Sequence, residues 1–187
     1  MGGLIGWTLA PLGWSIIVLI LLAVAAAPLF VRRARQMTRL DAARSVALDG
    51  FVVASLTVPL VFTLWPGDAG EATRPNLLPF RDLVNSLDMS TYYVRLAMAN
   101  LLGNVVLFVP WGFALAMRYD ALRLAGCTVV TAAIAIGIET WQAGIGRSVD
   151  ATDVLMNMLG GATGFLTARS ALPPVTDGSA VVPRSQR

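Results

Sequence analysis

Long apolar blocks separated by short polar segments dominate this chain. Five blocks are long enough to cross a bilayer, because about 20 helical residues at 1.5 Å each span roughly 30 Å of hydrocarbon. They run from Leu12 to Val31, Val46 to Trp65, Leu96 to Met117, Leu124 to Ala143 and Val154 to Leu172. The pattern predicts an all-α fold, a polytopic membrane helix bundle with about five transmembrane helices. The first block follows no basic residue and precedes an arginine cluster, so we interpret it as a retained anchor rather than a signal peptide.

The longest connection runs from Pro66 to about Tyr93. Pro75 and Pro79 exclude a regular helix across its middle. Apolar residues at helical spacing then predict a short external amphipathic helix lying at the interface, with the apolar residues Leu83, Val84, Leu87 and Met89. We divide the chain into an anchor with a basic cytoplasmic loop (1–45), a helical membrane domain (46–172) and a disordered cytoplasmic tail (173–187).

The amino-acid composition indicates the class of protein and excludes several kinds of catalytic and metal site. The chain is 56% hydrophobic and 13% charged, which indicates a membrane protein rather than a soluble domain. It has no His, which removes a Ser-His-Asp triad and every His-ligated metal site. The one cysteine, Cys127, lies in an apolar run and is expected to pack as a small hydrophobe. We expect no metal and no cofactor. Membrane topology accounts for the net charge of +3, so no nucleic-acid partner is expected.

The arginines predict the orientation. Ten lie on one side of the predicted spans: Arg32, Arg33, Arg35, Arg39, Arg44, Arg118, Arg123, Arg169, Arg184 and Arg187. Four lie on the other side: Arg74, Arg81, Arg95 and Arg147. The positive-inside rule then places the N-terminus outside and the C-terminus in the cytoplasm.

Polar residues interrupt the third span at helical spacing. Asn100 and Asn104 are one turn apart and share a face with Phe108. They are equally compatible with hydrogen bonds between helices and with the lining of a cavity. Pro110 should end or bend this helix, and Gly112 should let a neighbouring helix approach closely.

A second polar group surrounds the turn between the last two spans. Glu139 and Gln142 share a face at the end of the fourth span, and a short glycine-punctuated turn containing Arg147 makes the last two spans antiparallel neighbours. Asp150 begins the fifth span, where an N-cap with Asp153 completing a near capping box is the simplest reading. However, Asp150, Asp153, Asn157, Gly160 or Gly161, and Gly164 follow one face, and the glycines suit a tight helix contact.

These polar groups converge on one membrane face, predicted to be the outer one. A charge at mid-bilayer costs roughly 2.5–3.5 kcal/mol, so their grouping suggests a polar, partly acidic pocket. Its expected ligand-binding residues are Arg74, Asn76, Asn100, Asn104, Glu139, Gln142, Arg147, Asp150, Asp153 and Asn157.

The same residues resemble the VanZ-like family of bacterial membrane proteins. The matching elements are Asn76-Leu77-Leu78-Pro79-Phe80, Asn100-Leu101-Leu102-Gly103-Asn104 with Phe108-Val109-Pro110-Trp111-Gly112, and the spaced Glu139, Gln142, Arg147, Asp150, Asp153, Asn157 and Gly160. The resemblance covers about residues 50 to 167, and it implies a multi-pass protein of the bacterial plasma membrane. The family takes its name from a protein associated with low-level resistance to teicoplanin, a lipid-bearing glycopeptide.

Three functions remain open at this point. The first is a non-enzymatic envelope or resistance protein whose pocket binds membrane lipids, a lipid-linked wall precursor or a lipoglycopeptide. The second is an intramembrane enzyme acting on lipid-linked cell-wall intermediates, with Glu139, Asp150 and Asp153 as general acid and base or as oxygen ligands of a divalent metal. In that reading Arg147 and Arg74 would bind phosphate. The third, ion movement through Glu139, is the weakest, since no acidic relay reaches the inner half of the bundle.

Overall fold

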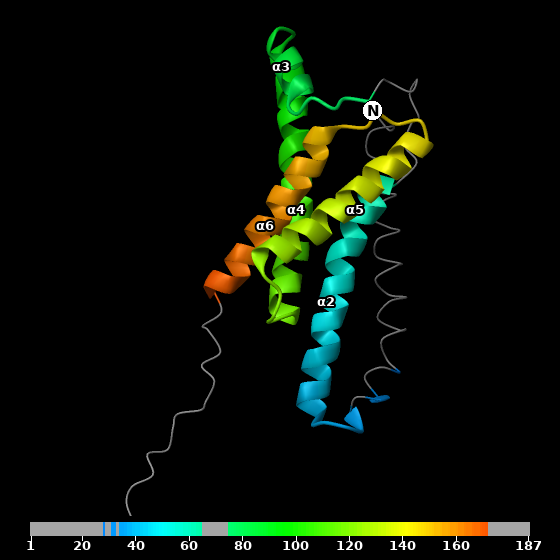
Figure 1. Cartoon of the computed structure of the whole chain (residues 1–187), viewed down its shortest axis with the longest axis vertical. Coiled ribbons are helices and arrows are strands. Elements are labelled where there is room, and N and C mark those ends of the chain that lie inside the picture. Colours follow the sequence, from blue (N-terminus) through cyan, green and yellow to red (C-terminus); the bar gives the residue numbers. More distant parts are fainter. Residues whose placement is uncertain (1–27, 29–30, 33, 65–74, 172–187) are drawn as a thin grey trace, which may run out of the picture.

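The computed structural model describes residues 28, 31–32, 34–64 and 75–171, and most of these residues are helical. In chain order the helices are α2 (Arg39–Leu64), α3 (Arg81–Leu87), α4 (Thr91–Arg118), α5 (Leu124–Gly144) and α6 (Ala151–Ala171), as Figure 1 shows. The only β-type pairing in the described ranges is an isolated bridge between two residues. The predicted all-α membrane fold is confirmed.

Helices α2, α4 and α5 are long and apolar enough to cross a membrane. Helix α6 is as long as α5, at 21 residues, but Asp153, Asn157 and its glycines make it less apolar. Pro110 lies inside α4 and does not end it, which corrects one of the two outcomes expected for this residue. The first predicted span lies almost wholly outside the described residues, and the predicted tail lies outside them entirely.

The closest helix pair in the bundle is α4 with α6, whose backbones touch through glycines. A Cβ atom added at Gly160 would lie 2.2 Å from the Val105 carbonyl oxygen, and one at Gly164 would lie 1.9 Å from the Val109 carbonyl oxygen. A Cβ at Gly112 would meet the backbone of α6 in the same way. Small residues at four-residue spacing permit such close approach in membranes, where van der Waals packing drives association. The glycine contact predicted for α6 and the close approach predicted at Gly112 are both confirmed.

Below this contact, large side chains from α4 and α6 close the core against α5. Phe108 and Cys127 are fully buried there, and Trp111, Leu115 and Phe165 are nearly so. The Trp111 indole Nε1 donates to Thr131 Oγ1 at 3.2 Å, so its polar edge is satisfied inside the bundle. Cys127 therefore packs as the small hydrophobe expected from the sequence.

At one end of the bundle, charged side chains connect the helices. Arg118 at the end of α4 forms an ion pair with Asp49 of α2. The Arg169 Nη2 atom, near the end of α6, donates to the carbonyl oxygens of Tyr119 at 2.9 Å and Asp120 at 2.8 Å, in the turn between α4 and α5. At the opposite end, α2 and α5 finish, and α4 and α6 begin beside α3 (Figure 1). We call this the α3 end of the bundle. It carries the second set of polar contacts.

Candidate functional site

The first turn of α6 is capped by two carboxylates from different helices. Asp150, the residue before the helix, accepts a hydrogen bond from the Thr152 backbone N–H at Oδ1 (2.7 Å), which is an N-cap. The backbone N–H of Asp150 itself donates to Glu139 Oε2 at 2.8 Å. In a capping box that second bond comes from the third residue of the same helix. Here the neighbouring helix α5 supplies it, so Glu139 fixes α6 against the end of α5.

Asp153 faces α4 instead of its own helix terminus. Its Oδ1 accepts from Asn104 Nδ2 at 2.6 Å and from Asn100 Nδ2 at 3.2 Å. The N-cap interpretation of Asp150 is confirmed, but Asp153 does not complete a capping box. It lies on the α4 contact face, where the glycine packing brings the two amides within its reach. Both interpretations of Asn100 and Asn104 hold, since they form hydrogen bonds between helices and also line a pocket described below.

The segment before α3 lies along the start of α6. Asn76 forms a parallel bridge with Asp150, in which the Asn76 N–H donates to the Val149 carbonyl (2.8 Å) and the Ala151 N–H donates to the Asn76 carbonyl (3.0 Å). The Asn76 side chain also donates to Asp82 at 3.2 Å and to Asp150 at 3.3 Å. Asn76 is buried and lines neither of the pockets described below. The hydrogen bonds of Asn76 attach the segment before α3 to the start of α6.

Phe80 gives the loop its final direction. Its φ of 61° is left-handed, a conformation that costs a non-glycine residue of order 1–3 kcal/mol. The Phe80 backbone N–H donates to Thr152 Oγ1 at 2.9 Å, and this contact helps to hold the strained residue. The chain then enters α3 over the beginning of α4 and α6, which confirms the short helix predicted in this connection.

Arg147 and Gln142 converge on the end of α2. The Arg147 guanidinium donates to the Thr63 carbonyl at 2.9 Å, and Gln142 Nε2 donates to the same oxygen at 3.0 Å. The ion pairs among the described residues are Arg118 with Asp49 and Arg169 with Asp120, so neither involves Arg147. Arg147 therefore donates its hydrogen bond to the backbone of α2 and not to a carboxylate.

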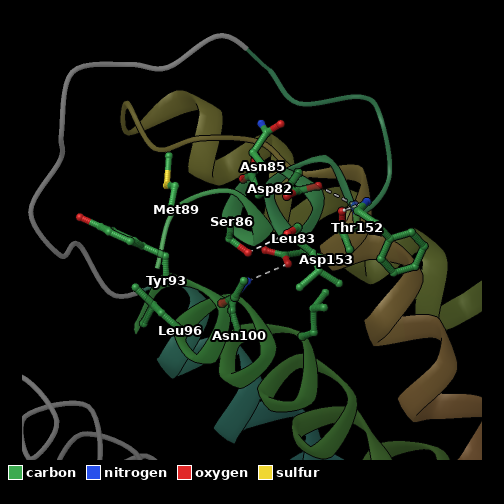
Figure 2. Close-up of a pocket in the computed structure, with 14 residues that line it drawn as sticks. Asp82, Leu83, Asn85, Ser86, Met89, Tyr93, Leu96, Asn100, Thr152 and Asp153 are labelled. Atoms are coloured by element: carbon green, nitrogen blue, oxygen red, sulfur yellow. Dashed lines mark hydrogen bonds between the residues drawn. The ribbon is translucent and has the colours of Figure 1, made fainter. Parts of the chain in front are cut away.

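A pocket of about 510 Å³ opens between α3, the start of α4 and the start of α6. We call it the large pocket. Figure 2 shows apolar and aromatic side chains, Met89, Tyr93 and Leu96, on one side of it, and Thr152 and Asp153 on the other. Asn100 points across toward Asp153 and makes the hydrogen bond drawn between them. The cavity thus has an apolar side and an acidic, amide-bearing side.

A second pocket of about 240 Å³, the small pocket, lies between α2, α4, α5 and α6. Its polar lining consists of Thr63, Asn100, Asn104, Glu139, Gln142, Arg147, Asp153 and Asn157. Asn100 and Asp153 line both pockets, so this pair forms their shared wall. Asn157 is only 1% exposed, and its Oδ1 has no hydrogen-bond partner in the part of the chain that the structure describes.

Most of the residues predicted from sequence meet at this end of the bundle. Seven line the small pocket: Asn100, Asn104, Glu139, Gln142, Arg147, Asp153 and Asn157. Asp150 lines the large one. Arg74 lies outside the described residues. Sequence reasoning missed Asp82 and Thr152, which also line the large pocket. Thr152 stood between two selected aspartates, and its hydroxyl was the available signal.

Comparison with known proteins gives a family assignment. The VanZ/LLP1 family profile matches residues 16–172, which extends N-terminally beyond the resemblance seen from motifs and includes most of the first predicted span. Neither the curated proteins nor the solved structures contain a match to this chain. The family match covers the described helices and both pockets. The chain belongs to the VanZ/LLP1 family of membrane proteins.

Proposed function

We propose that this protein binds a lipidated or lipid-linked amphiphile at the α3 end of its bundle, and that binding alters the envelope or its response to lipid-bearing glycopeptides. The observation that carries the proposal is the divided lining of the large pocket. Met89, Tyr93 and Leu96 offer apolar surface, whereas Asp153 and Asn100 offer hydrogen-bonding groups across the same hollow. Its volume of about 510 Å³ falls within the roughly 300–1,000 Å³ typical of ligand sites.

The sequence supports where this site would act. The ten-to-four arginine distribution favours an extracytoplasmic position for the α3 end, in a bacterial plasma membrane with the C-terminus in the cytoplasm. Teicoplanin and wall precursors are both amphiphiles that meet the membrane from that side. The name of the family, which comes from a teicoplanin-resistance protein, supports the same class of ligand.

The test is lipid identification in protein purified in mild detergent, with a variant that fills the pocket. Ala97→Phe places a ring in the large pocket, whereas Ala133→Phe places one on an exposed face of α5. We expect the wild type and Ala133→Phe to retain a defined amphiphile by native mass spectrometry, and Ala97→Phe to retain at least about ten-fold less, a difference of about 1.4 kcal/mol. Equal retention in all three proteins would refute the proposal.

The same preparation tests the enzymatic alternative. The observation that favours it is the presence of two carboxylates, Glu139 and Asp153, in one small pocket. An enzyme acting on a lipid-linked intermediate would release a chemically altered product during incubation with membranes. Asp153→Asn would then abolish product formation while leaving the bound amphiphile in place.

A further inference from the structure

We infer that the small pocket receives a primary ammonium group, carried by the amphiphile whose apolar part occupies the large pocket. This inference rests on the proposed function and specifies the head group that the site selects. It starts from oxygen atoms in the small pocket that lack a donor.

The first of these atoms is Asn157 Oδ1. It is a buried atom without a partner among the described residues, and its residue lines the small pocket. A buried acceptor without a partner loses its hydration and gains nothing in return, so such an atom indicates a missing donor. An N–H or O–H group entering the pocket would supply one.

The two carboxylates supply further acceptors. Glu139 accepts its hydrogen bond at Oε2, and both hydrogen bonds to Asp153 fall on Oδ1. The second oxygen of each carboxylate therefore accepts no hydrogen bond from the described residues. Together with Asn157 Oδ1 these make three acceptor oxygens on residues that line one pocket, and an –NH₃⁺ group carries three donors.

Charge favours the same ligand. An ammonium beside Glu139 and Asp153 would favour their ionised forms. With Arg147 protonated, the titratable groups lining the small pocket then sum to one negative charge. A buried charge is costly unless it is paired and hydrogen-bonded. An ammonium neutralises the pocket, whereas an anionic head group would increase the imbalance.

The shared wall connects the two pockets. Asn100 and Asp153 line both of them, so the two pockets adjoin at this pair, and a ligand that occupies both would lie across it. An amphiphile can then leave its chain beside Met89 and Leu96 and place its amine beyond Asp153. The Asp153 carboxylate is held at this boundary by both amides of α4.

Two phospholipids with identical tails test the inference. Palmitoyl-oleoyl phosphatidylethanolamine has three N–H donors, and the phosphatidylcholine replaces all three by methyl groups. In native mass spectrometry titrations of the full chain, we expect the ethanolamine lipid to bind at least about ten-fold more tightly than the choline lipid. Equal affinity, or a preference for phosphatidylglycerol, would overturn the ammonium assignment. If neither lipid binds, the ammonium assignment fails, whereas the proposed function is decided by the retention of an amphiphile in the wild type and Ala97→Phe.

Variants and a soluble head group complete the test. Asn157→Leu and Glu139→Gln should each reduce the preference for the ethanolamine lipid several-fold without weakening choline-lipid binding. Asp120→Asn, a carboxylate-to-amide change in the turn at the other end of the bundle, should leave the preference unchanged. Phosphoethanolamine without tails should bind far more weakly than the lipid. Equal affinity would show that the tails contribute nothing to binding, and would refute the inference that the ammonium group belongs to an amphiphile lying in the large pocket. An unaltered preference in both pocket variants would mean that Asn157 Oδ1 meets only water, and would refute the inference.

Discussion

Replacing a glycine in α6 by alanine tests the helix contact that positions the site. In Gly164→Ala the new methyl carbon would lie 1.9 Å from the Val109 carbonyl oxygen, and in Gly160→Ala it would lie 2.2 Å from that of Val105. Real Cβ atoms essentially never approach another heavy atom within 3.0 Å. The obstructing atoms belong to the backbone of α4 and cannot rotate away. The two helices must therefore separate.

The cost follows from two opposing effects. Overpacking of a close contact typically costs about 1–3 kcal/mol, occasionally more. Alanine recovers part of this because it favours a helix interior over glycine by about 1 kcal/mol. We expect a net loss of up to about 2 kcal/mol for Gly160→Ala. The loss should be greater for Gly164→Ala, where the overlap is larger. At the roughly 2–4 °C per kcal/mol of globular chains of this size, Gly160→Ala should melt up to about 8 °C lower.

The chain supplies its own reporter for this measurement. Cys127 is the one cysteine and is fully buried, so a thiol-reactive fluorophore signals only when the bundle opens. Gly137→Ala in α5 is the matched control, because a Cβ there meets no atom within 4 Å. It should melt at or slightly above the wild-type temperature. If Gly164→Ala also melts there, α4 and α6 do not touch at this point and the reasoning is refuted.

Three further outcomes are expected. Asp153→Asn preserves an acceptor for the amides of α4, so it should insert and melt within a few degrees of wild type, yet lose any tolerance to a lipoglycopeptide that the wild type confers; full tolerance would make the carboxylate structural. Glu139→Gln can still accept the hydrogen bond at the start of α6, so it should also fold normally and lose tolerance in the same assay. Asp120→Asn should keep the wild-type tolerance. A membrane-impermeant thiol reagent on intact cells should label a cysteine at Gly70, outside the described residues, and spare Cys127; the reverse pattern would contradict the predicted topology.

The sequence predicted the helices and the face of α6 well, because both depend on spacing within one element. Apolar blocks of bilayer length predicted α2, α4 and α5, and most of the predicted helix ends lie within a few residues of the observed ones. Steps of three and four residues placed Asp153, Asn157 and Gly160 on one face, and the structure turns that face toward α4. Such patterns follow from helical geometry alone.

The partners of the polar groups were harder to predict. A carboxylate three residues after an N-cap fits a capping box, yet Asp153 instead binds amides about 50 residues earlier in the chain. The choice depends on how closely α4 approaches, which depends in turn on glycine contacts between helices. The left-handed Phe80 had no sequence signal, since glycine and asparagine are the residues usually found in that conformation. Its consequence, the position of α3 over the large pocket, could not be foreseen from the pattern.

The start of α6 is held from three directions by hydrogen bonds. Glu139 fixes it to α5, Asp153 fixes it to α4, and Asp150 fixes it to the loop at Asn76. Each carboxylate makes its structural bond through a backbone or amide donor, which a neutral amide acceptor can also satisfy. Asp153 and Glu139 each keep a second oxygen that no described residue bonds. Replacing either one by its amide therefore removes charge from the small pocket while leaving the framework acceptor in place, so a loss of binding in those variants reports on the pocket and not on the fold.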